Sequence, residues 1–301
     1  MSRTNRQPRS RRSRVLRAGV SGVLLVAAVI IPLRTTGCME RLFYYPTRAE
    51  TVPPPELAGA ESVWFDSADG TRLHGWFIPA EGGTAGDVAG PAAATILHVH
   101  GNAGNIESHV WFTGFLPRAG FNLFIFDFRG YGRSEGGARR RGPLIADTHA
   151  AVDALLARSD VDAARLGMYA QSLGGAIGLN VMADRHELAS CVAVSAFTSW
   201  RDIAADSVGG GRAGPFSRLL ARMLIRDDHR ADVAIARIDR PVLVIHGTDD
   251  RIVPVRHARR LAEAGPTAEL VELDGGDHND MRTTHPEIDR LVIEFFRRTL
   301  H

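Results

Sequence analysis

The fold is decided by the sequence RLGMYAQSLGGAIGLN, which spans residues 165–180. Residues 165–169 form an apolar run of the kind that makes a buried parallel strand. Ala170 and Gly174 stand two positions before and two positions after Ser172, and their small size lets a following helix cross the strand closely. A serine at such a strand-to-helix turn has its Oγ above the sheet, at the positive end of the helix. The stretch therefore predicts a nucleophile elbow at Ser172, with Ala170 in place of the usual first glycine of G-x-S-x-G.

Apolar runs alternate with helix-like segments on both sides of this stretch. Buried strands are expected at residues 95–99, 122–126, 165–169, 190–195, 242–245 and 268–273, and helices at 104–118, 143–158, 173–184, 254–264 and 286–299. Residues 62–65 and 73–79 predict an antiparallel hairpin before them. The alternation predicts an α/β fold with a mostly parallel central sheet and helices on both faces. Ligands of such sheets bind beyond the carboxyl ends of the strands.

The chain divides into a leader and one folded domain. Residues 1–38 are interpreted as a targeting or anchor segment, and residues 39–60 as a stiff, proline-containing linker without periodicity. Residues 61–301 are the predicted α/β domain. Within it, residues from about 196 to 240 contain no convincing strand, so we expect a small cap insertion over the edge where the strands end.

Loops after the later strands carry the partners that a nucleophilic serine needs. Serine requires a base at neutral pH, and the order expected in this architecture is nucleophile, acid, histidine. Asp249 and Asp250 follow the fifth predicted parallel strand, and His278 follows the sixth. Residues 100–105, HGNAGN, follow the first, and their glycines let backbone N–H groups turn inward as an oxyanion hole.

Taken together, these segments are similar to those of a known family. Residues 98–105, HVHGNAGN, residues 127–134, DFRGYGRS, and the serine, aspartate and histidine loops resemble the α/β-hydrolase fold serine hydrolases. The resemblance is specifically to their short-cap, lipase- and serine-aminopeptidase-like branch, and it covers about residues 60–300. It implies an α/β-hydrolase fold.

The same resemblance assigns roles by position. It implies that Ser172 is the nucleophile, His278 the general base and acid, and Asp250 the orienting carboxylate, since the pattern H-G-x-x-D-x-x-V-P has its acid at the fifth position. The backbone N–H groups of Leu173 and Asn102 are the implied oxyanion donors. No cofactor and no metal are expected.

Several other histidine, aspartate and arginine residues are expected to have structural roles. His98 and His100 alternate on one strand as in H-x-H metal motifs, but without a further ligand cluster they are expected to anchor the oxyanion loop by hydrogen bonds. Asp127 and Arg129 are expected to form a buried ion pair, and arginines 139–141 a solvated loop. The chain contains no lysine, which excludes a pyridoxal Schiff base and a Walker-A phosphate loop.

Charge is unevenly distributed along the 301 residues. Seven arginines lie before Ala18 and no acidic residue precedes Glu40, so the formal net charge of +2 hides a folded part that is net negative. A nucleic-acid binder usually keeps its positive charge on the folded domain, so nucleic acid is excluded as a partner. The uncharged residues 18–33 are too few to span a bilayer and, after the arginines, are typical of a signal peptide.

Cys38 ends this leader in a context that resembles a bacterial lipoprotein box, in which the cysteine is lipidated and becomes the mature N-terminus. The alternatives are an uncleaved N-terminal anchor, ordinary secretion, and an unmodified thiol at Cys38. The leading interpretations predict a membrane-associated, extracytoplasmic protein that meets the membrane through its N-terminal segment.

Three hypotheses for function follow. The first is a serine hydrolase that cleaves small carboxylic esters or thioesters through an acyl-enzyme intermediate. The second is a serine exopeptidase with the same catalytic residues, which needs an acidic pocket for the substrate's amino group; the candidates are Asp202, Asp206, Asp227 and Asp228. The third is a non-catalytic binding protein on a hydrolase scaffold.

Overall fold

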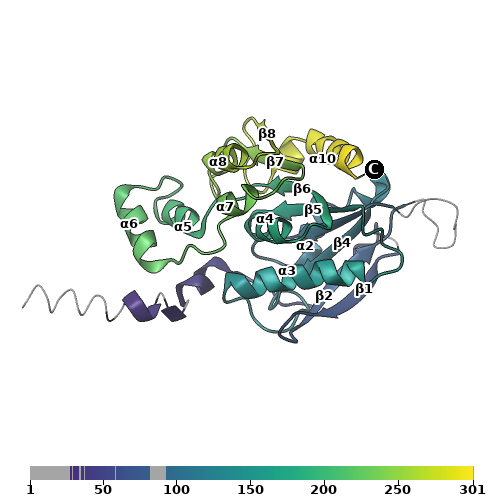
Figure 1. Ribbon diagram of the computed structural model, residues 1–301, viewed down its shortest axis with the longest axis horizontal. Coiled ribbons are helices and arrows are strands. Elements are labelled where there is room, and N and C mark those ends of the chain that lie inside the picture. Colours follow the sequence, from purple (N-terminus) through teal and green to yellow (C-terminus); the bar gives the residue numbers. More distant parts are fainter. Residues whose placement is uncertain are drawn as a thin grey trace, which may run out of the picture.

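An eight-stranded sheet forms the centre of the computed structural model, which describes residues 28, 30–33, 35–36, 38–57, 59–81 and 93–300 (Figure 1). Its strands are β1 (Glu61–Asp66), β2 (Arg72–Ile78), β3 (Thr95–Val99), β4 (Asn122–Asp127), β5 (Leu166–Gln171), β6 (Leu188–Val194), β7 (Val242–Gly247) and β8 (Ala268–Leu273). They lie in the order β1-β2-β4-β3-β5-β6-β7-β8. The predicted hairpin is present, and it lies at one edge of the sheet.

The six strands from β3 to β8 run parallel, while β1 and β2 pair antiparallel with each other and β2 pairs antiparallel with β4. All residues of β3, β4, β5 and β7 are buried. Strands covered on both faces must be apolar throughout, which is why these segments are continuous apolar runs in the sequence. Parallel strands also bring their carboxyl ends, and the loops that follow them, to one edge of the sheet.

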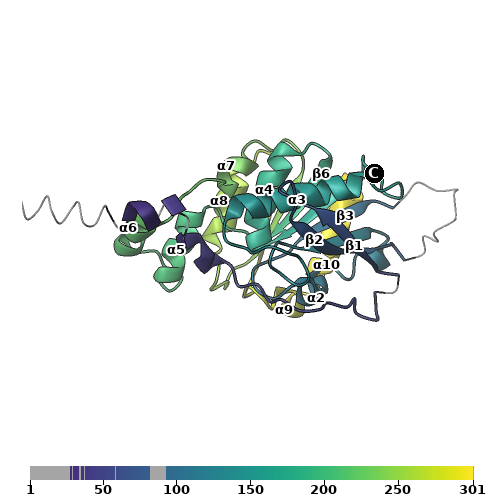
Figure 2. The same ribbon diagram turned by 90° about the horizontal axis from the view of Figure 1, so that it is seen from below.

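Helices cover both faces of the sheet (Figure 2). One face carries α3 (Arg141–Leu156), α4 (Leu173–Asp184), α7 (Ala231–Ile235) and α8 (Arg256–Ala264), and the other carries α2 (Ile106–His109), α9 (Met281–Thr284) and α10 (Glu287–Thr299). Each face has its own cluster of buried apolar side chains. This two-sided packing places one core above the sheet and one below it.

The predicted helix over residues 104–118 is mostly absent. Only four residues form α2, and short 3-10 turns follow at Val110–Phe112 and Pro117–Ala119. A Cβ on Gly114 would lie 3.1 Å from the carbonyl oxygen of Val110, a tight contact that glycine avoids, and glycine is a poor helix former. Pro117 lacks an amide hydrogen, which also prevents a continuous helix.

The cap insertion contributes α5 (Trp200–Val208) and α6 (Pro215–Leu224), which lie together at one end of the molecule (Figure 1). Ser199 begins α5 by accepting a hydrogen bond from the amide of Asp202, the usual role of a serine before a helix. Pro215 is the first residue of α6, where the missing amide hydrogen costs nothing.

Part of the expected linker packs against the domain. We call residues 38–47 the strap; its first part is a 3-10 helix, η1 (Cys38–Phe43). The amide of Thr47 donates to the carbonyl of Gly104 (3.0 Å), and the amide of Gly132 donates to the carbonyl of Thr47 (3.0 Å). The strap therefore runs beside the oxyanion loop.

A buried ion pair fixes the other end of the strap. Glu40 is 6% exposed and accepts from the side chain of Arg141 (3.2 Å), which is 1% exposed and lies over the ring of Trp200 at 4.5 Å. Arg141 therefore does not belong to a solvated loop, as the sequence suggested; it joins the strap to the start of α3 and to α5.

The expected signal peptide or anchor comprises residues 1–38, and of these only residues 28, 30–33, 35–36 and 38 belong to the described part of the chain. Within the described part, no helix combines the length and the apolar character that crossing a bilayer requires. Cys38 is exposed at the start of η1, and its Sγ accepts a hydrogen bond from Thr36 (3.1 Å).

Candidate active site

Ser172 occupies a strained turn between β5 and α4. Its φ of 51° and ψ of −112° lie in a region that residues with a side chain rarely adopt. A Cβ on Gly174 would lie 2.1 Å from the carbonyl oxygen of Val99, and one on Gly175 would lie 2.5 Å from the Cβ of Ala196. The helix therefore crosses the neighbouring strands at a distance that only glycine allows.

Ala170 stands where the pattern usually has glycine, and it is fully buried. Its methyl group faces Gly178, one turn into α4, where an added Cβ would lie 3.0 Å from the Cβ of Ala170 and 2.7 Å from the sulfur of Met168. Glycine at position 178 therefore provides the space that the alanine takes up.

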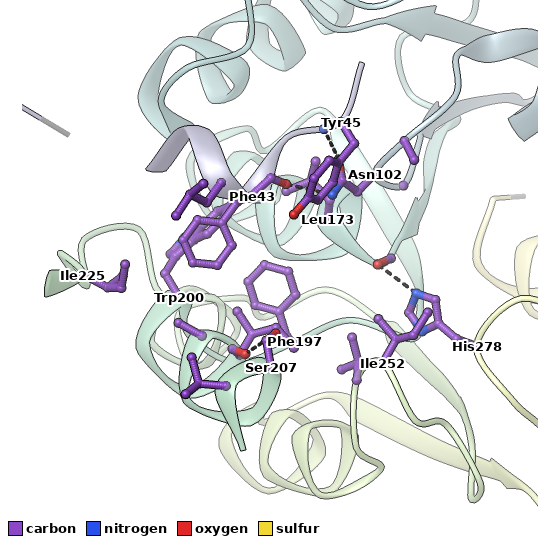
Figure 3. A pocket seen from close by; sticks show the side chains of 18 of the residues that line it. Phe43, Tyr45, Asn102, Leu173, Phe197, Trp200, Ser207, Ile225, Ile252 and His278 are labelled. Carbon is purple, nitrogen blue, oxygen red and sulfur yellow. Dashed lines mark hydrogen bonds between the residues drawn. The ribbon is translucent and has the colours of Figure 1, made fainter. Parts of the chain in front are cut away.

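Three side chains from three loops form one hydrogen-bond chain. Ser172 Oγ lies 3.0 Å from Nε2 of His278, and Nδ1 of His278 lies 2.7 Å from Oδ2 of Asp250. His278 lies at the edge of the cavity in Figure 3. All three residues are at most 9% exposed. The hydroxyl can donate to the ring while the ring donates to the carboxylate, which is the arrangement needed to remove the hydroxyl proton.

Asp250 is fixed from several sides. Its Oδ1 accepts from the amides of Ile252 (2.9 Å) and Val253 (2.7 Å), and Nε2 of His246 lies 3.2 Å from its Oδ2. Burial alone would raise the pKa of Asp250, but the hydrogen bonds from His246 and His278 outweigh it and hold the pKa well below its usual value. Asp250 is therefore ionised at neutral pH. Asp249, the rival in the sequence, is exposed.

The loop after β3 turns sharply beside Ser172. Ala103 and Gly104 both have positive φ, 65° and 61°, and a Cβ on Gly104 would lie 2.4 Å from the hydroxyl of Ser108. Asn102 precedes this turn, and Leu173 is the first residue of α4; both line the same cavity as Ser172. The two proposed oxyanion donors thus lie on the cavity that holds the hydroxyl.

The strap holds the side chain of Asn102. Its Nδ2 donates to the carbonyl of Phe43 (2.7 Å), and its Oδ1 accepts from the amide of Tyr45 (3.1 Å) (Figure 3). The same Oδ1 also accepts from the hydroxyl of Tyr131 (2.8 Å). Both Nδ2 and Oδ1 have partners, which fixes the orientation of the side-chain amide. No sequence pattern indicated this contact, because it joins residues nearly sixty positions apart.

Buried histidines support the loop from below. His100 bonds to the carbonyl of Gly101 (2.7 Å) and His109 bonds to the carbonyl of Ala103 (3.0 Å). His98 bonds instead to Thr113 (2.8 Å), outside residues 100–105, so the expectation that it anchors this loop was wrong. Burial lowers the pKa of all three histidines, so their rings are neutral near pH 7. His109, which the sequence analysis missed, also reaches Gln171, the residue before Ser172, at 3.1 Å.

The expected ion pair between Asp127 and Arg129 does not form. Arg129 pairs with Asp147 (2.6 Å) and Asp69 (2.7 Å) instead. Asp127 accepts from the amide of Ile106 (2.9 Å), at the start of α2, and its other oxygen is buried without a partner among the described residues. Burial raises the pKa of Asp127 to about 7, although backbone hydrogen bonds oppose the shift.

A cavity of about 550 Å³ opens in front of Ser172. Its walls come from the strap, from α5 and α6, and from the loops of the sheet; Phe43, Phe197, Trp200, Ile225 and Ile252 are among the apolar side chains that line it (Figure 3). No aspartate, glutamate or arginine is found among its described lining residues. The described lining is therefore mostly apolar and carries no carboxylate or guanidinium group.

The acidic residues of the cap are held elsewhere by cations. Asp202 pairs with Arg260 (2.6 Å), Asp206 bonds to His257 (2.8 Å) and to Arg256, Asp227 accepts from the amide of Arg201 (3.1 Å), and Asp228 pairs with Arg141 (3.1 Å). None of the four lines the cavity. Among the described residues, no group of three or more histidine, cysteine or acidic side chains is arranged to hold a metal ion.

Comparisons with known proteins agree with this architecture. Residues 90–231 match the family described as serine aminopeptidase S33, and residues 225–300 match the family described as TAP-like protein. Protein YfhR of Escherichia coli K12 is 37% identical over 242 residues, which cover 79% of each chain. Protein Rv2307c of Mycobacterium tuberculosis H37Rv is 34% identical over 286 residues, covering 93% of each.

A plant relative and a solved structure extend the comparison. The α/β hydrolase domain-containing protein WAV2 of Arabidopsis thaliana is 31% identical over 281 residues, covering 87% of each chain. The esterase Pf2001 of Pyrococcus furiosus has the same fold, with a TM-score of 0.68 at 22% identity over 85% of this chain and all of that one. The strand order, the elbow and these relatives together show that the chain belongs to the α/β-hydrolase family.

Proposed function

We propose that the protein is a serine hydrolase that cleaves carboxylic esters or thioesters with an apolar acyl group. The observation that carries the proposal is the chain of contacts from Ser172 through His278 to Asp250, at 3.0 and 2.7 Å. It opens onto an apolar cavity of about 550 Å³, a size typical of small-molecule sites.

The proposed reaction uses only groups of this chain. Ser172 Oγ attacks the substrate carbonyl carbon while Nε2 of His278 takes the hydroxyl proton. The carbonyl oxygen becomes an oxyanion, which the amides of Asn102 and Leu173 stabilise. The bond to the leaving group then breaks, and His278 returns the proton to that group. Water repeats the sequence on the acyl-enzyme, and ionised Asp250 stabilises the imidazolium in both halves.

The cavity favours an ester over a peptide with a free amino group. An exopeptidase needs a carboxylate near the substrate's ammonium group, because an unpaired buried charge is strongly unfavourable. The described lining has no carboxylate, and the four cap candidates are already paired with cations or backbone amides. We therefore expect activity on acyl esters and none on aminoacyl or prolyl naphthylamides.

Replacement of the serine tests the proposal. Ser172→Ala should lower kcat on p-nitrophenyl butyrate by about 10⁵- to 10⁶-fold, the scale of loss for such a nucleophile. It should also abolish labelling by a fluorophosphonate probe. Ser207→Ala is the matched control, because Ser207 lines the same cavity but its hydroxyl bonds to the carbonyl of Ile203 (2.8 Å). Full turnover by Ser172→Ala, or a folded protein that the probe never labels, would refute the hydrolase.

A further inference from the structure

The cap contains a long stretch without acidic residues. Residues 207–226 read SVGGGRAGPFSRLLARMLIR and include four arginines, and α6 lies within them. Most other segments of the folded part mix both signs of charge. A helix with apolar and basic residues and no acidic ones is typical of segments that lie on membrane surfaces.

One face of α6 has no partner in the described part of the chain. Ser217 and Ala221 are buried, and their side of the helix packs on α5. Phe216 is 75% exposed and Leu219 is 57% exposed. Phenylalanine and leucine that exposed, so close together on one helix, are unusual in a soluble protein unless they contact something.

Arginines stand between and beside these apolar side chains. Arg218 and Arg222 are exposed, and neither forms an ion pair with any carboxylate that the structure describes. In contrast, Arg256 and Arg260, on the neighbouring helix α8, both pair with aspartates of α5. The outer face of α6 is therefore apolar and positively charged at once.

The apolar surface continues around the mouth of the cavity. Leu42 of the strap, Val208 at the end of α5 and Ile252 after β7 are 62%, 59% and 52% exposed, and all three also line the cavity. Helix α6 also lines the cavity itself, through Leu220, Ala221 and Leu224. A surface laid against α6 would therefore also cover the mouth through which an acyl chain enters.

We propose that α6 and this rim dock on an anionic lipid bilayer, with Phe216 and Leu219 in the headgroup–acyl boundary and Arg218 and Arg222 on lipid phosphates. Charge complementarity selects this partner over a second copy of the chain. A symmetric contact through α6 would bring the arginines of one copy against those of the other, whereas anionic headgroups neutralise them. The docking needs no catalytic residue, so the Ser172→Ala protein is expected to dock as well.

A fluorescent label on α6 tests the proposal in the full chain. Because the label reports on its own position, membrane binding by the N-terminal segment does not by itself produce the signal. In a Cys38→Ser background, Phe216→Cys provides the one reactive thiol of the described chain, because Cys191 is fully buried. A nitrobenzoxadiazole label there should brighten severalfold with phosphatidylglycerol vesicles and much less with phosphatidylcholine vesicles. Val233→Cys, on α7 and with a side chain 55% exposed, is the matched control and should not respond.

The charge requirement is tested separately. Arg218→Gln with Arg222→Gln should weaken the response of the label by about 10- to 30-fold in lipid concentration. Arg290→Gln with Arg297→Gln removes the same charge from α10, at the other end of the molecule, and should change nothing (Figure 1). No response at position 216, an equal response at 233, or an equal loss in both arginine pairs would overturn the proposal. So would brightening that grows with protein concentration in the absence of vesicles, since a second copy would then cover the face.

Discussion

At the scale of single residues, the site depends on side chains whose charge is set by burial and hydrogen bonds. Asp249 and Asp250 are neighbours of the same chemical type, yet only Asp250 is buried and receives amides of its own loop. These hydrogen bonds keep its pKa low despite burial. The carboxylate is therefore charged and fixed beside His278, where the proposed reaction needs it to stabilise an imidazolium.

The two aspartates give a paired prediction. Asp250→Asn should lower kcat on p-nitrophenyl butyrate by about 10³- to 10⁴-fold, because an amide favours the wrong tautomer of His278 and cannot stabilise its positive charge. Asp249→Asn should leave kcat within about twofold, since that side chain is exposed. Steady-state kinetics give kcat for each variant, and circular dichroism shows whether each variant is folded. Equal losses in both variants would contradict the assignment of Asp250.

Asp127 gives a prediction for stability against pH. The unfolded carboxyl loses its proton near 3.8, whereas the folded one keeps it to about 7. Between these values the folded state binds more protons, so the free energy of unfolding should fall as pH rises, by about 1.4 kcal/mol per pH unit from this group. Asp127→Asn removes the titration and should retain the hydrogen bond from the amide of Ile106.

The measurement is urea unfolding of both proteins from pH 4 to pH 7. The difference in free energy of unfolding, wild type minus Asp127→Asn, should decrease steadily across this range. A difference that stays constant would show that Asp127 titrates at the same pH in the folded and unfolded states.

At the scale of elements, the strap is the part that joins otherwise separate loops. Asn102→Ala removes three hydrogen bonds, to Phe43, Tyr45 and Tyr131, while the backbone amide proposed as oxyanion donor remains. Because a displacement of about 1 Å at a reacting centre can cost 100-fold in rate, we expect kcat to fall about 10- to 100-fold with KM little changed. Stopped-assay kinetics on p-nitrophenyl butyrate measure both constants.

Tyr131→Phe is the control for this prediction. It removes the bond from Tyr131 to Asn102 and leaves the two bonds to the strap, so its kcat should fall less than threefold. If Asn102→Ala behaves like Tyr131→Phe, or if both raise KM alone, the strap does not position the oxyanion loop.

The elements that the sequence predicted well are those defined by local pattern. The six parallel strands are continuous apolar runs, and each is confirmed with bounds that differ from the predicted ones by at most two residues. The helix expected at 104–118 was wrong because Gly114 and Pro117 act within a pattern that is otherwise helical. A prediction that rests only on the spacing of apolar residues does not take the glycine and the proline into account.

The candidate site likewise contains residues that the sequence predicted and contacts that it did not. The order of Ser172, Asp250 and His278 is visible in the sequence because each follows a strand that ends at the same edge. The roles of Glu40 and Arg141 are not visible, since their ion pair joins positions 101 residues apart. The partners of Arg129 were wrong for the same reason: Asp69 and Asp147 reach it only through tertiary packing.

At the scale of the whole molecule, the cavity belongs to no single segment. Phe43 of the strap, Trp200 and Phe197 of the cap form edge-to-face ring contacts at 5.4 and 5.1 Å, and the loops of the sheet supply Ser172 and His278. Figure 3 shows Ile225 far from His278 across this space. We therefore expect the end of α6 to limit how far the acyl chain of the proposed substrate extends from Ser172.

A substitution at this distal end should change chain-length preference without changing the chemistry. Leu224, next to Ile225, lines the cavity, and Leu224→Trp would fill part of it. We expect kcat/KM for p-nitrophenyl laurate to fall at least tenfold, because the tryptophan prevents the burial of several methylenes, which contribute about 0.8 kcal/mol each. The value of kcat/KM for the butyrate ester should stay within about twofold. Leu219→Trp adds the same bulk to the same helix on its exposed side and should leave the ratio of the two esters unchanged when both are assayed as soluble monomers. A butyryl chain is too short to reach position 224, so a tryptophan there should not obstruct it. An equal loss of kcat/KM on both esters in Leu224→Trp would therefore mean that the acyl chain does not extend toward the end of α6.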